Sequence, residues 1–540
     1  MNNYARASLF VGAVLSSLAT GPARAVGASD CAKLATRAFS STTITSATLV
    51  GASGVFPESC RIVGYVDKEI NFELRLPTAW NQKFLFQGYG GLDGAPPLQT
   101  LQLNLGSPGA PPGVQRGYAV VATDTGHAST NGTVYDGSWA YHNAERQVNW
   151  AYRSTHVVAI AAREIISAYY GRAPRFSYYH GCSGGGRHAA MSAQRYPTDF
   201  DGVVAGDPFL KPPGQTISWN WTEQVLAASP IPPAKLPLIA KAALSECDGK
   251  DGVVDGLISD PRRCRFDPGT LACPGTTDRP DCLTQPQIGS LRKLYGGPRN
   301  SAGEQLFPGW EPGLEDLVWP SALVNTVNGG PGQLLVQLPD NFLKYFVFGP
   351  GFDPFSFDFD TDPAKLEPAS KLFDVKPDLS GFAKAGGKMI TFVGWASPRL
   401  VPPLSIQFHE AVGRNLKGEE ERGDHNGQAS MRVDDFYRLF MVPGMGHCAG
   451  GTGPTNFDTL AALEKWVEQG IAPNRIIGSH LTNGAVDRTR PLCPYPQEAV
   501  YTGRGSIDDA ANFVCRVRHV QDIVNEDVYR PRGDDEEGRD

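Results

Sequence analysis

The segment 181–185, which reads Gly-Cys-Ser-Gly-Gly, constrains the fold more than any other part of this chain. A short strand over 176–180 is predicted before it, and a helix running to about Tyr196 is predicted after it. A serine on such a sharp strand-to-helix turn has a strained backbone that only small neighbours tolerate. Because G-x-S-x-G often arises by chance in a glycine-rich chain, the strand and helix around it carry the argument. They make Ser183 a candidate nucleophile above the end of a strand.

Strands alternate with helices on both sides of this turn. This pattern is typical of an α/β fold in which a mostly parallel, doubly wound sheet is covered by helices on both faces. The predicted helices are 146–170, which Gly171 ends, the helix after Ser183, and 460–469. The other predicted strands are 61–66, 70–76, 83–87, 118–123, 202–206, 388–393 and 436–442.

The alternation stops after Asp207. Residues 208–376 are rich in proline, glycine and aromatic side chains, and they hold four of the ten cysteines. We predict that this segment is an inserted lid domain and that 26–207 and 377–540 together form the main domain. Eight Phe or Tyr residues fall within 342–359. Aromatic walls suit a flat ring, although most of these side chains are expected to form the core of the lid.

The N-terminus predicts export from the cytoplasm. Arg6 precedes an apolar run over 7–18, and Ala-Arg-Ala at 23–25 is a cleavage signal, so residues 1–25 read as a signal peptide. The apolar run is too short to span a membrane, which requires about 18 residues or more. The formal charge of 49 − 56 = −7 argues against a nucleic-acid partner. We therefore expect a secreted or periplasmic protein with a small-molecule partner and no membrane partner, and the sequence carries no signal for an oligomeric state.

An even number of cysteines in an exported chain favours disulfides over free thiols. The alternative is that some of them are small buried side chains. Neighbours in sequence suggest four pairs, and these leave Cys182 and Cys448, which are far apart in the chain. The four pairs are Cys31–Cys60, Cys247–Cys264, Cys273–Cys282 and Cys493–Cys515.

A serine nucleophile needs a base, which in this chain order is a histidine after the last strand of the sheet. His447 follows the strand 436–442 in a turn of small residues, whereas His409 and His425 read as helix or surface histidines. Cys182 precedes Ser183 and Cys448 follows His447. If Ser183 and His447 are in contact, these two cysteines fall within bonding distance of each other.

Two glycine turns can supply hydrogen-bond donors to a tetrahedral oxyanion. The backbone N–H of Gly184 lies at the N-terminus of the predicted helix. A second donor is expected from Gly90 or Gly91, which follow the strand 83–87.

The pattern Gly-Cys-Ser-x-Gly-Gly-Arg at 181–187, together with Pro-Gly-Met-Gly-His-Cys at 443–448, resembles the tannase and feruloyl esterase family. The family also includes mono(hydroxyethyl) terephthalate hydrolases, and the resemblance covers essentially the whole mature chain. It implies an α/β-hydrolase fold with a lid inserted after the strand that ends near Gly206. The activity implied is a serine carboxylic-ester hydrolase that acts on esters of phenolic or aromatic acids, with galloyl, feruloyl and terephthaloyl groups all open.

The loop 247–257 has three carboxylates among glycines, a density that suits Ca²⁺. It is not an EF-hand, because position twelve is Ser259 rather than Glu, and the alternative is a charged glycine turn. The resemblance implies a structural Ca²⁺ whose ligands lie in this loop, which the cysteines at 247 and 264 would staple. The implied ligands are the carboxylates of Asp248, Asp251 and Asp255 and the carbonyls of Val253 and Leu257.

The sequence departs from the family at the acid of the triad. Members normally carry it in a Gly-x-Ala-Asp-Pro segment, and here residues 394–398 read Gly-Trp-Ala-Ser-Pro. Serine cannot stabilise an imidazolium by charge. Asp207, where the family usually has a small residue, is our candidate for a relocated acid. The alternative for Asp207 is a turn cap before Pro208.

Two functions therefore follow from the sequence. One is an esterase in which Ser183, His447 and Asp207 form the triad. The other is a catalytically impaired relative that binds aromatic ligands, because Ser397 stands at the usual position of the acid.

Overall fold

The structure is a computed structural model, and it describes residues 28–313, 315–322, 334–421 and 431–518. The predicted signal peptide lies outside the described residues. Within the described part of the chain, no helix has the length and apolar character needed to cross a bilayer.

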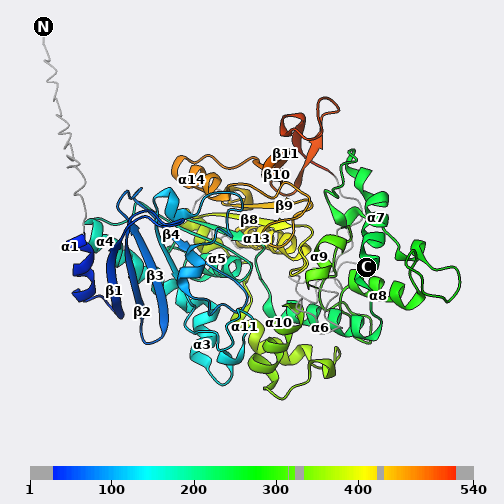
Figure 1. Cartoon of the computed structure of the whole chain (residues 1–540), viewed down its shortest axis with the longest axis horizontal. Coiled ribbons are helices and arrows are strands. Elements are labelled where there is room, and N and C mark those ends of the chain that lie inside the picture. Colours follow the sequence, from blue (N-terminus) through cyan, green and yellow to red (C-terminus); the bar gives the residue numbers. More distant parts are fainter. Residues whose placement is uncertain (1–27, 314, 323–333, 422–430, 519–540) are drawn as a thin grey trace, which may run out of the picture.

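A nine-stranded sheet runs through the molecule in the order β1-β2-β3-β5-β4-β6-β7-β8-β9 (Figure 1). The first three strands are antiparallel to their neighbours, and the six from β5 to β9 run parallel to one another. The predicted strands are therefore found, and β1 is an addition that the sequence argument missed. The bounds are β1 Thr42–Val50, β2 Ser59–Val66, β3 Ile70–Pro77, β4 Lys83–Gln87, β5 Ala119–Thr123, β6 Phe176–Cys182, β7 Gly202–Gly206, β8 Lys388–Gly394 and β9 Tyr437–Val442.

Helices cover both faces of this sheet. Successive side chains of a strand point to opposite faces, so in β7 Val203 and Ala205 enter one apolar cluster and Val204 enters another. The first cluster includes α4 (Ser154–Tyr170), α5 (Gly184–Arg195) and α13 (Pro403–Glu421). The second includes α2 (Pro97–Leu101) and α14 (Thr459–Gln469). Because both faces are buried, the parallel strands are almost wholly apolar.

The single helix predicted over 146–170 is interrupted. α3 (Ala144–Val148) and α4 are joined by a π-helical turn, Asn149–Arg153, and Gly171 ends α4 with φ 73°. The buried guanidinium of Arg187 donates to the carbonyls of Ala151 and Trp150 at 2.9 and 2.8 Å. A side chain that takes up carbonyls of a helix is a recognised cause of such a turn, and it is invisible in the apolar periodicity.

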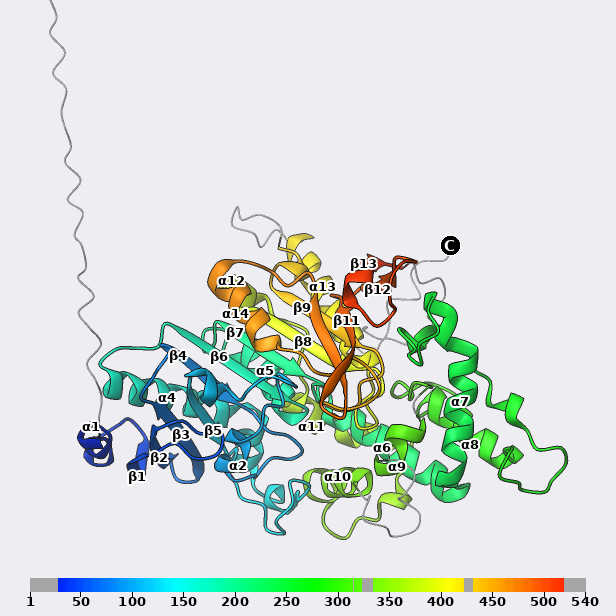
Figure 2. The same cartoon turned by 45° about the horizontal axis from the view of Figure 1, so that its top comes forward.

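Between β7 and β8 the described residues contribute helices and no strand to the sheet. Most of these helices gather at the end of the molecule away from β1–β3 (Figures 1 and 2), whereas the last of them, residues 380–384, packs on α5. The arrangement is compatible with the predicted lid, whose boundaries stay a prediction. The helices are α6 Pro212–Ala228, α7 Leu236–Cys247, α8 Gln285–Gly296, α9 Glu315–Ala322, α10 Leu334–Phe342, α11 Glu367–Phe373 and α12 Ser380–Lys384.

Two small sheets follow α14, and the sequence argument did not predict them. β10 (Ile476–Thr482) pairs with β11 (Ala485–Leu492), and β12 (Gln497–Tyr501) pairs with β13 (Phe513–Val517). They lie beside β9 and close to the loop that follows α7 (Figure 2). At the other end of the chain, α1 (Ala28–Lys33) packs on β1 and carries Cys31.

All five predicted disulfides are present, which confirms the pairing inferred from the sequence. The bonds are Cys31–Cys60, Cys182–Cys448, Cys247–Cys264, Cys273–Cys282 and Cys493–Cys515. The alternative of free buried cysteines is therefore wrong.

Candidate active site

Ser183 occupies the turn between β6 and α5. Its φ of 62° and ψ of −121° lie in a region that side chains rarely adopt. Its N–H donates to the carbonyl of Gly206 at 2.9 Å, and its carbonyl accepts the N–H of Arg187 at 3.0 Å. A Cβ on Gly185 would lie only 2.3 Å from the carbonyl oxygen of Tyr89. This close approach of two backbones is why the turn needs glycine after the serine.

The glycine turn after β4 meets this serine. A Cβ on Gly90 would lie 3.2 Å from the Cβ of Ser183 and 3.5 Å from the amide nitrogen of Gly184. Gly91, with φ 64°, presents its carbonyl to Gly184. Gly184 is the first residue of α5, so its N–H has no partner within the helix. The residues predicted as oxyanion donors are therefore neighbours around Ser183.

His447 lies in the loop after β9 and is almost fully buried. The disulfide between Cys182 and Cys448, whose Cα atoms are 5.9 Å apart, joins this loop to the residue before Ser183. Among the competing histidines, His409 is buried in α13 against Tyr437, and His425 lies outside the described residues. His447 is thus the histidine that the structure ties to Ser183.

Two groups approach Nδ1 of His447. The hydroxyl of Ser397 lies 3.1 Å away, and the nearer carboxylate oxygen of Asp207 lies 3.9 Å away. Ser397 therefore occupies the hydrogen-bonding position, at the place where the family carries its acid. Asp207 is behind it, too far for a direct hydrogen bond and close enough for its charge to act on the ring.

Asp207 is held rigidly and is fully buried. Its two carboxylate oxygens accept the N–H of Gly394 at 3.0 Å and the N–H of Cys448 at 2.6 Å. Its φ of 32° is strained for an aspartate. The alternative prediction, in which Asp207 only caps a turn, accounts for neither bond, because both lead to the segments that carry Ser397 and His447.

Burial acts on both ionisable groups of this pair. It raises the pKa of Asp207 to about 7, against the opposing effects of the N–H groups of Cys448 and Gly394 and of the charge on Arg399. It lowers the pKa of His447 well below its usual 6.5, and the charge of Arg399 lowers it further. The imidazole is therefore neutral at neutral pH, which is the form that a general base requires.

A buried polar network beneath the oxyanion turn was not predicted. Arg187, although part of the quoted motif, received no role from the sequence, and its guanidinium lies 4.1 Å from the ring centre of Trp150. It also approaches Nδ1 of His188 at 3.4 Å, which leaves Nε2 of His188 facing the carboxylate of Asp93 at 3.6 Å. The sequence signal that could have indicated this network is the position of Arg187, directly after three glycines at the start of a helix.

The predicted calcium ligands lie in one loop at the end of α7. Each carboxylate accepts hydrogen bonds from backbone N–H groups of the same loop. Asp248 accepts the N–H of Asp255 at 3.1 Å and that of Gly256 at 2.9 Å. Asp251 and Asp255 likewise accept the N–H groups of Val253 and Leu257. The five residues that the resemblance implied are thus brought together by turns that the carboxylates themselves stabilise.

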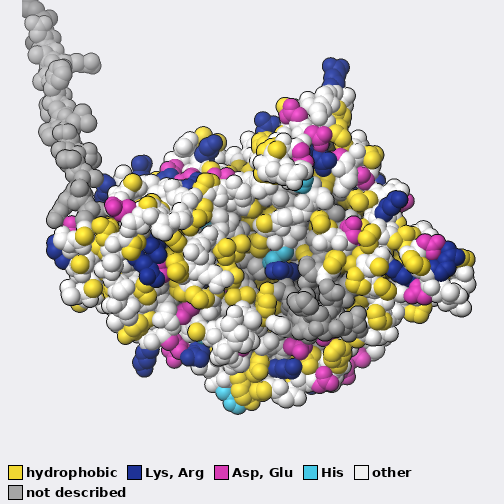
Figure 3. Space-filling view, in the orientation of Figure 1, with side chains coloured by type: hydrophobic (Ala, Val, Ile, Leu, Met, Phe, Trp, Pro, Cys, Tyr) yellow, Lys and Arg dark blue, Asp and Glu magenta, His cyan; other side chains and the backbone are white. Residues whose placement is uncertain are grey.

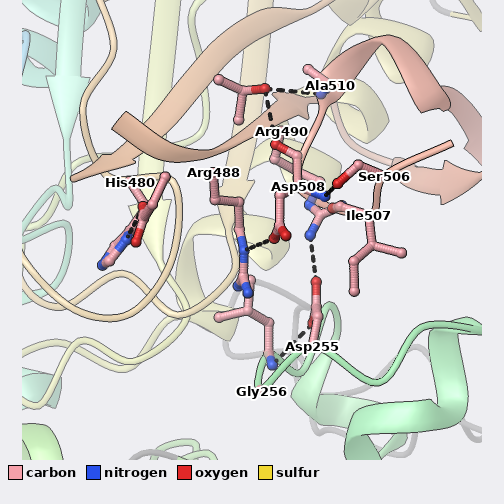
Figure 4. Close-up of polar contacts among 12 residues, drawn as sticks. Asp255, Gly256, His480, Arg488, Arg490, Ser506, Ile507, Asp508 and Ala510 are labelled. Atoms are coloured by element: carbon pink, nitrogen blue, oxygen red, sulfur yellow. Dashed lines mark hydrogen bonds and ion pairs between the residues drawn. The ribbon is translucent and has the colours of Figure 1, made fainter. Parts of the chain in front are cut away.

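Asp255 also has a cationic partner. Its second oxygen is paired with Arg490 of β11, which is 5% exposed (Figure 4). Burial raises the pKa of Asp255, Arg490 and Arg488 oppose this rise, and the charges of Asp251 and Asp248 add to it. Three mutually repelling carboxylates are hard oxygen donors of the kind that Ca²⁺ prefers.

Among the described residues, only one group of three potential His, Cys, Asp or Glu ligand atoms lies mutually within 4.8 Å, and it is Cys182, Asp207 and Cys448. Its two sulfurs form a disulfide and are not available as ligands. The three carboxylates of the loop are spaced more widely. Their chemistry fits calcium, and calcium binding there stays a prediction.

A cavity of about 630 Å³ opens beside this loop rather than at Ser183. The loop, α13 and the C-terminal strands line it, and Trp395 lies between it and Ser397. The lid aromatics mostly build the core, as expected: Phe342 is buried and stacks on Phe346.

The model of the family described as tannase and feruloyl esterase matches residues 53–516. An uncharacterized esterase of Xanthomonas campestris pv. campestris is 38% identical over 90% of this chain and 91% of its own length. The mono(2-hydroxyethyl) terephthalate hydrolase of Piscinibacter sakaiensis is 32% identical over 87% of each chain. The crystal structure of feruloyl esterase B from Aspergillus oryzae superposes with a TM-score of 0.78 at 26% identity and covers 91% of this chain and 100% of that one. The fold is that of an α/β-hydrolase, and the chain belongs to the tannase and feruloyl esterase family of carboxylic ester hydrolases.

Proposed function

We propose that this enzyme hydrolyses esters of phenolic or aromatic acids through a serine nucleophile and an acyl-enzyme. The strained backbone of Ser183 and the disulfide that ties its neighbour to the loop of His447 carry this proposal. Ser183 attacks the ester carbonyl while His447 takes its proton. The N–H groups of Gly184 and of the Gly90–Gly91 turn stabilise the oxyanion.

The charge that normally supports the imidazolium comes from Asp207 in this proposal. Ser397 orients the imidazole through Nδ1, and the carboxylate of Asp207 acts on it from 3.9 Å. The proton thus moves from Ser183 to His447 and then to the leaving alcohol, and water repeats the cycle in deacylation.

The second candidate is a protein that binds aromatic ligands without turnover. The hydroxyl at Ser397, where relatives carry a carboxylate, favours it. A fluorophosphonate probe separates the two: we expect one covalent adduct, located by mass spectrometry on Ser183 and lost in Ser183→Ala. A protein without an adduct and without a burst of phenol from an aryl ester is the binding protein.

The preferred acyl group is tested by a screen. Methyl gallate, methyl ferulate and a terephthalate monoester represent the three groups that the resemblance leaves open. The enzyme proposal requires turnover of at least one of them at a rate that Ser183→Ala abolishes.

We also propose that the protein is exported and carries a structural Ca²⁺ in the loop that follows α7. The apolar N-terminal run and the five disulfides support export. Asp248, Asp251, Asp255 and the carbonyls of Val253 and Leu257 would hold the ion, which would supply no chemistry to the ester reaction. Sequencing of the mature N-terminus, expected to begin at Val26, tests the export.

A further inference from the structure

Three polar side chains that the mechanism does not use are carried by the loops around the nucleophile: Arg399, Tyr89 and Tyr135. All three are half-buried. Within the part of the chain that the structure describes, neither the guanidinium of Arg399 nor the hydroxyl of Tyr89 or Tyr135 has a hydrogen-bond or ion-pair partner. Half-buried donors that lack partners are suited to meet a ligand.

Backbone hydrogen bonds place the loops of Tyr89 and Tyr135 next to Ser183. The carbonyl of Tyr89 accepts the N–H of Gly185 at 2.6 Å, directly before the glycine turn that contacts Ser183. The N–H of Leu92 donates to the carbonyl of Val134 at 3.0 Å, which brings Tyr135 against the same turn. Both tyrosines therefore belong to the loops around the oxyanion site.

Arg399 enters from the other side. It lies two residues after Ser397, whose hydroxyl contacts His447. Its carbonyl accepts the indole N–H of Trp219 at 2.7 Å, and the N–H of Val401 donates to the side chain of Gln215 at 3.1 Å. The turn that carries Arg399 is thus pinned to α6.

The charge of Arg399 reaches both sides of the site. It opposes the rise that burial causes in the pKa of Tyr89 and in the pKa of Tyr135. It also acts on His447 and on Asp207, as described above. A positive charge is therefore placed among the two phenols and the catalytic base, without a counter-ion among the described residues.

This placement has a cost for catalysis. His447 becomes a cation when it takes the proton of Ser183, and Arg399 repels that cation while Ser397 offers no negative charge against it. A carboxylate brought by the substrate would neutralise Arg399 at that step. It would therefore assist both binding and proton transfer.

We propose that Arg399, together with the hydroxyls of Tyr89 and Tyr135, binds a carboxylate of the ester substrate, so that the preferred substrates are anionic esters. This proposal rests on the proposed function and names its substrate class. The carboxylate can belong to the acyl part or to the alcohol part, and the experiment distinguishes these sources.

The experiment compares anionic esters with neutral isosteres. The acyl arm uses methyl 4-carboxybenzoate against methyl 4-carbamoylbenzoate, and the alcohol arm uses carboxymethyl benzoate against carbamoylmethyl benzoate. We expect at least one arm to favour the anion tenfold or more in kcat/KM. A ratio near one in both arms overturns the proposal, even if Ser183 is labelled and the neutral esters are hydrolysed.

The decisive variant is Arg399→Gln. It should bring the anionic-to-neutral ratio to about one, because the positive charge that binds the carboxylate is gone. An unchanged ratio overturns the proposal. Arg432→Gln makes the same charge change before β9 on a side chain that is 75% exposed, and it should keep the parent ratio.

A measurement on the parent protein covers the case in which Arg399→Gln does not fold. Terephthalate should inhibit hydrolysis of the neutral ester competitively and at least tenfold more tightly than terephthalamide, and added salt should weaken this inhibition. Equal inhibition by the two compounds overturns the proposal.

Discussion

Nδ1 of His447 faces a hydroxyl where the family resemblance implies a carboxylate, and this residue-scale exchange carries the sharpest prediction. Asp207→Asn keeps one of the two backbone hydrogen bonds through its amide oxygen, loses the other because its NH2 group cannot accept, and removes the charge 3.9 Å from Nδ1. By the serine-protease template, in which losing the acid costs a factor of about ten thousand, we expect kcat to fall by about two orders of magnitude or more. The measurement is kcat on an aryl ester, with circular dichroism as the check on folding.

Two further variants test whether Asp207 or Ser397 supports the imidazolium of His447. Ser397→Asp in the Asp207→Asn background should restore part of the activity, because it returns a carboxylate to hydrogen-bonding distance. Ser397→Ala alone should cost less than Asp207→Asn. Parent-like activity of Asp207→Asn would show that His447 works without this carboxylate.

The pH profile is a second prediction at this scale. Burial and Arg399 hold the pKa of His447 well below 6.5, so the neutral imidazole persists to lower pH than for an exposed histidine. Burial raises the pKa of Asp207 to about 7, so the charge that supports the imidazolium is lost as the pH falls through that value. The acid limb of kcat/KM for a neutral ester should therefore lie near pH 7 in the parent and move upward in Arg399→Gln, whereas the residual activity of Asp207→Asn should keep its limb below pH 6.5. A limb at or above 6.5 in Asp207→Asn would contradict the assignment of His447 as this buried base.

At the scale of elements, the nucleophile and its base are on different strands that one covalent bond connects. The Cys182–Cys448 bond closes a loop with a sequence separation of 266 residues. Replacing both cysteines by alanine should lower kcat at least tenfold and lower Tm, because the loop after β9 loses its attachment to β6. Replacing Cys273 and Cys282, whose separation is 9 residues in the lid, is the matched control and should leave kcat unchanged. Equal losses of kcat in the two double variants would contradict a specific role of the Cys182–Cys448 bond in holding His447 near Ser183.

The same scale shows how far the sequence could lead. Strands buried on both faces, such as β7, are predicted correctly because a short apolar run between two turns is too short for most helices. β1 was missed because its pattern is half exposed, and β10–β13 were missed because they are short strands that form two-stranded sheets outside the main sheet. The site residues follow from glycine turns and from cysteine adjacency, which are local in sequence. The sequence did not predict which group hydrogen-bonds to Nδ1 of His447. Ser397 and Asp207 lie at the ends of two different strands, and the packing of the sheet sets their distances to the ring.

At the scale of the whole molecule, ion pairs and hydrogen bonds join the C-terminal strands to the loop 247–257. Besides Asp255, the guanidinium of Arg490 donates to the carbonyl of Ile507 at 2.7 Å and lies 3.8 Å from the ring centre of Phe513 (Figure 4). Arg518 contacts the carbonyl of Asp251, and Arg263 pairs with Glu498. On the face shown in Figure 3, by contrast, charged side chains are scattered over the surface. The cations at the loop are a local arrangement between two parts of the fold.

Asp255 thus has two possible cationic partners, Arg490 and the proposed Ca²⁺, and this sharing gives the last prediction. Breaking a buried ion pair by removing one partner costs about 3–5 kcal/mol, because the remaining charge is left uncompensated. In Arg490→Met the metal would be the only partner left, so chelation by EDTA should lower Tm more in this variant than in the parent. Arg292→Met removes the partner of Asp267, whose side chain is 58% exposed, and this exposed pair is worth at most about 1 kcal/mol. The EDTA-induced shift should therefore be the same in Arg292→Met as in the parent. If EDTA leaves Tm unchanged in all three proteins, the loop is a charged glycine turn held by Arg490 alone.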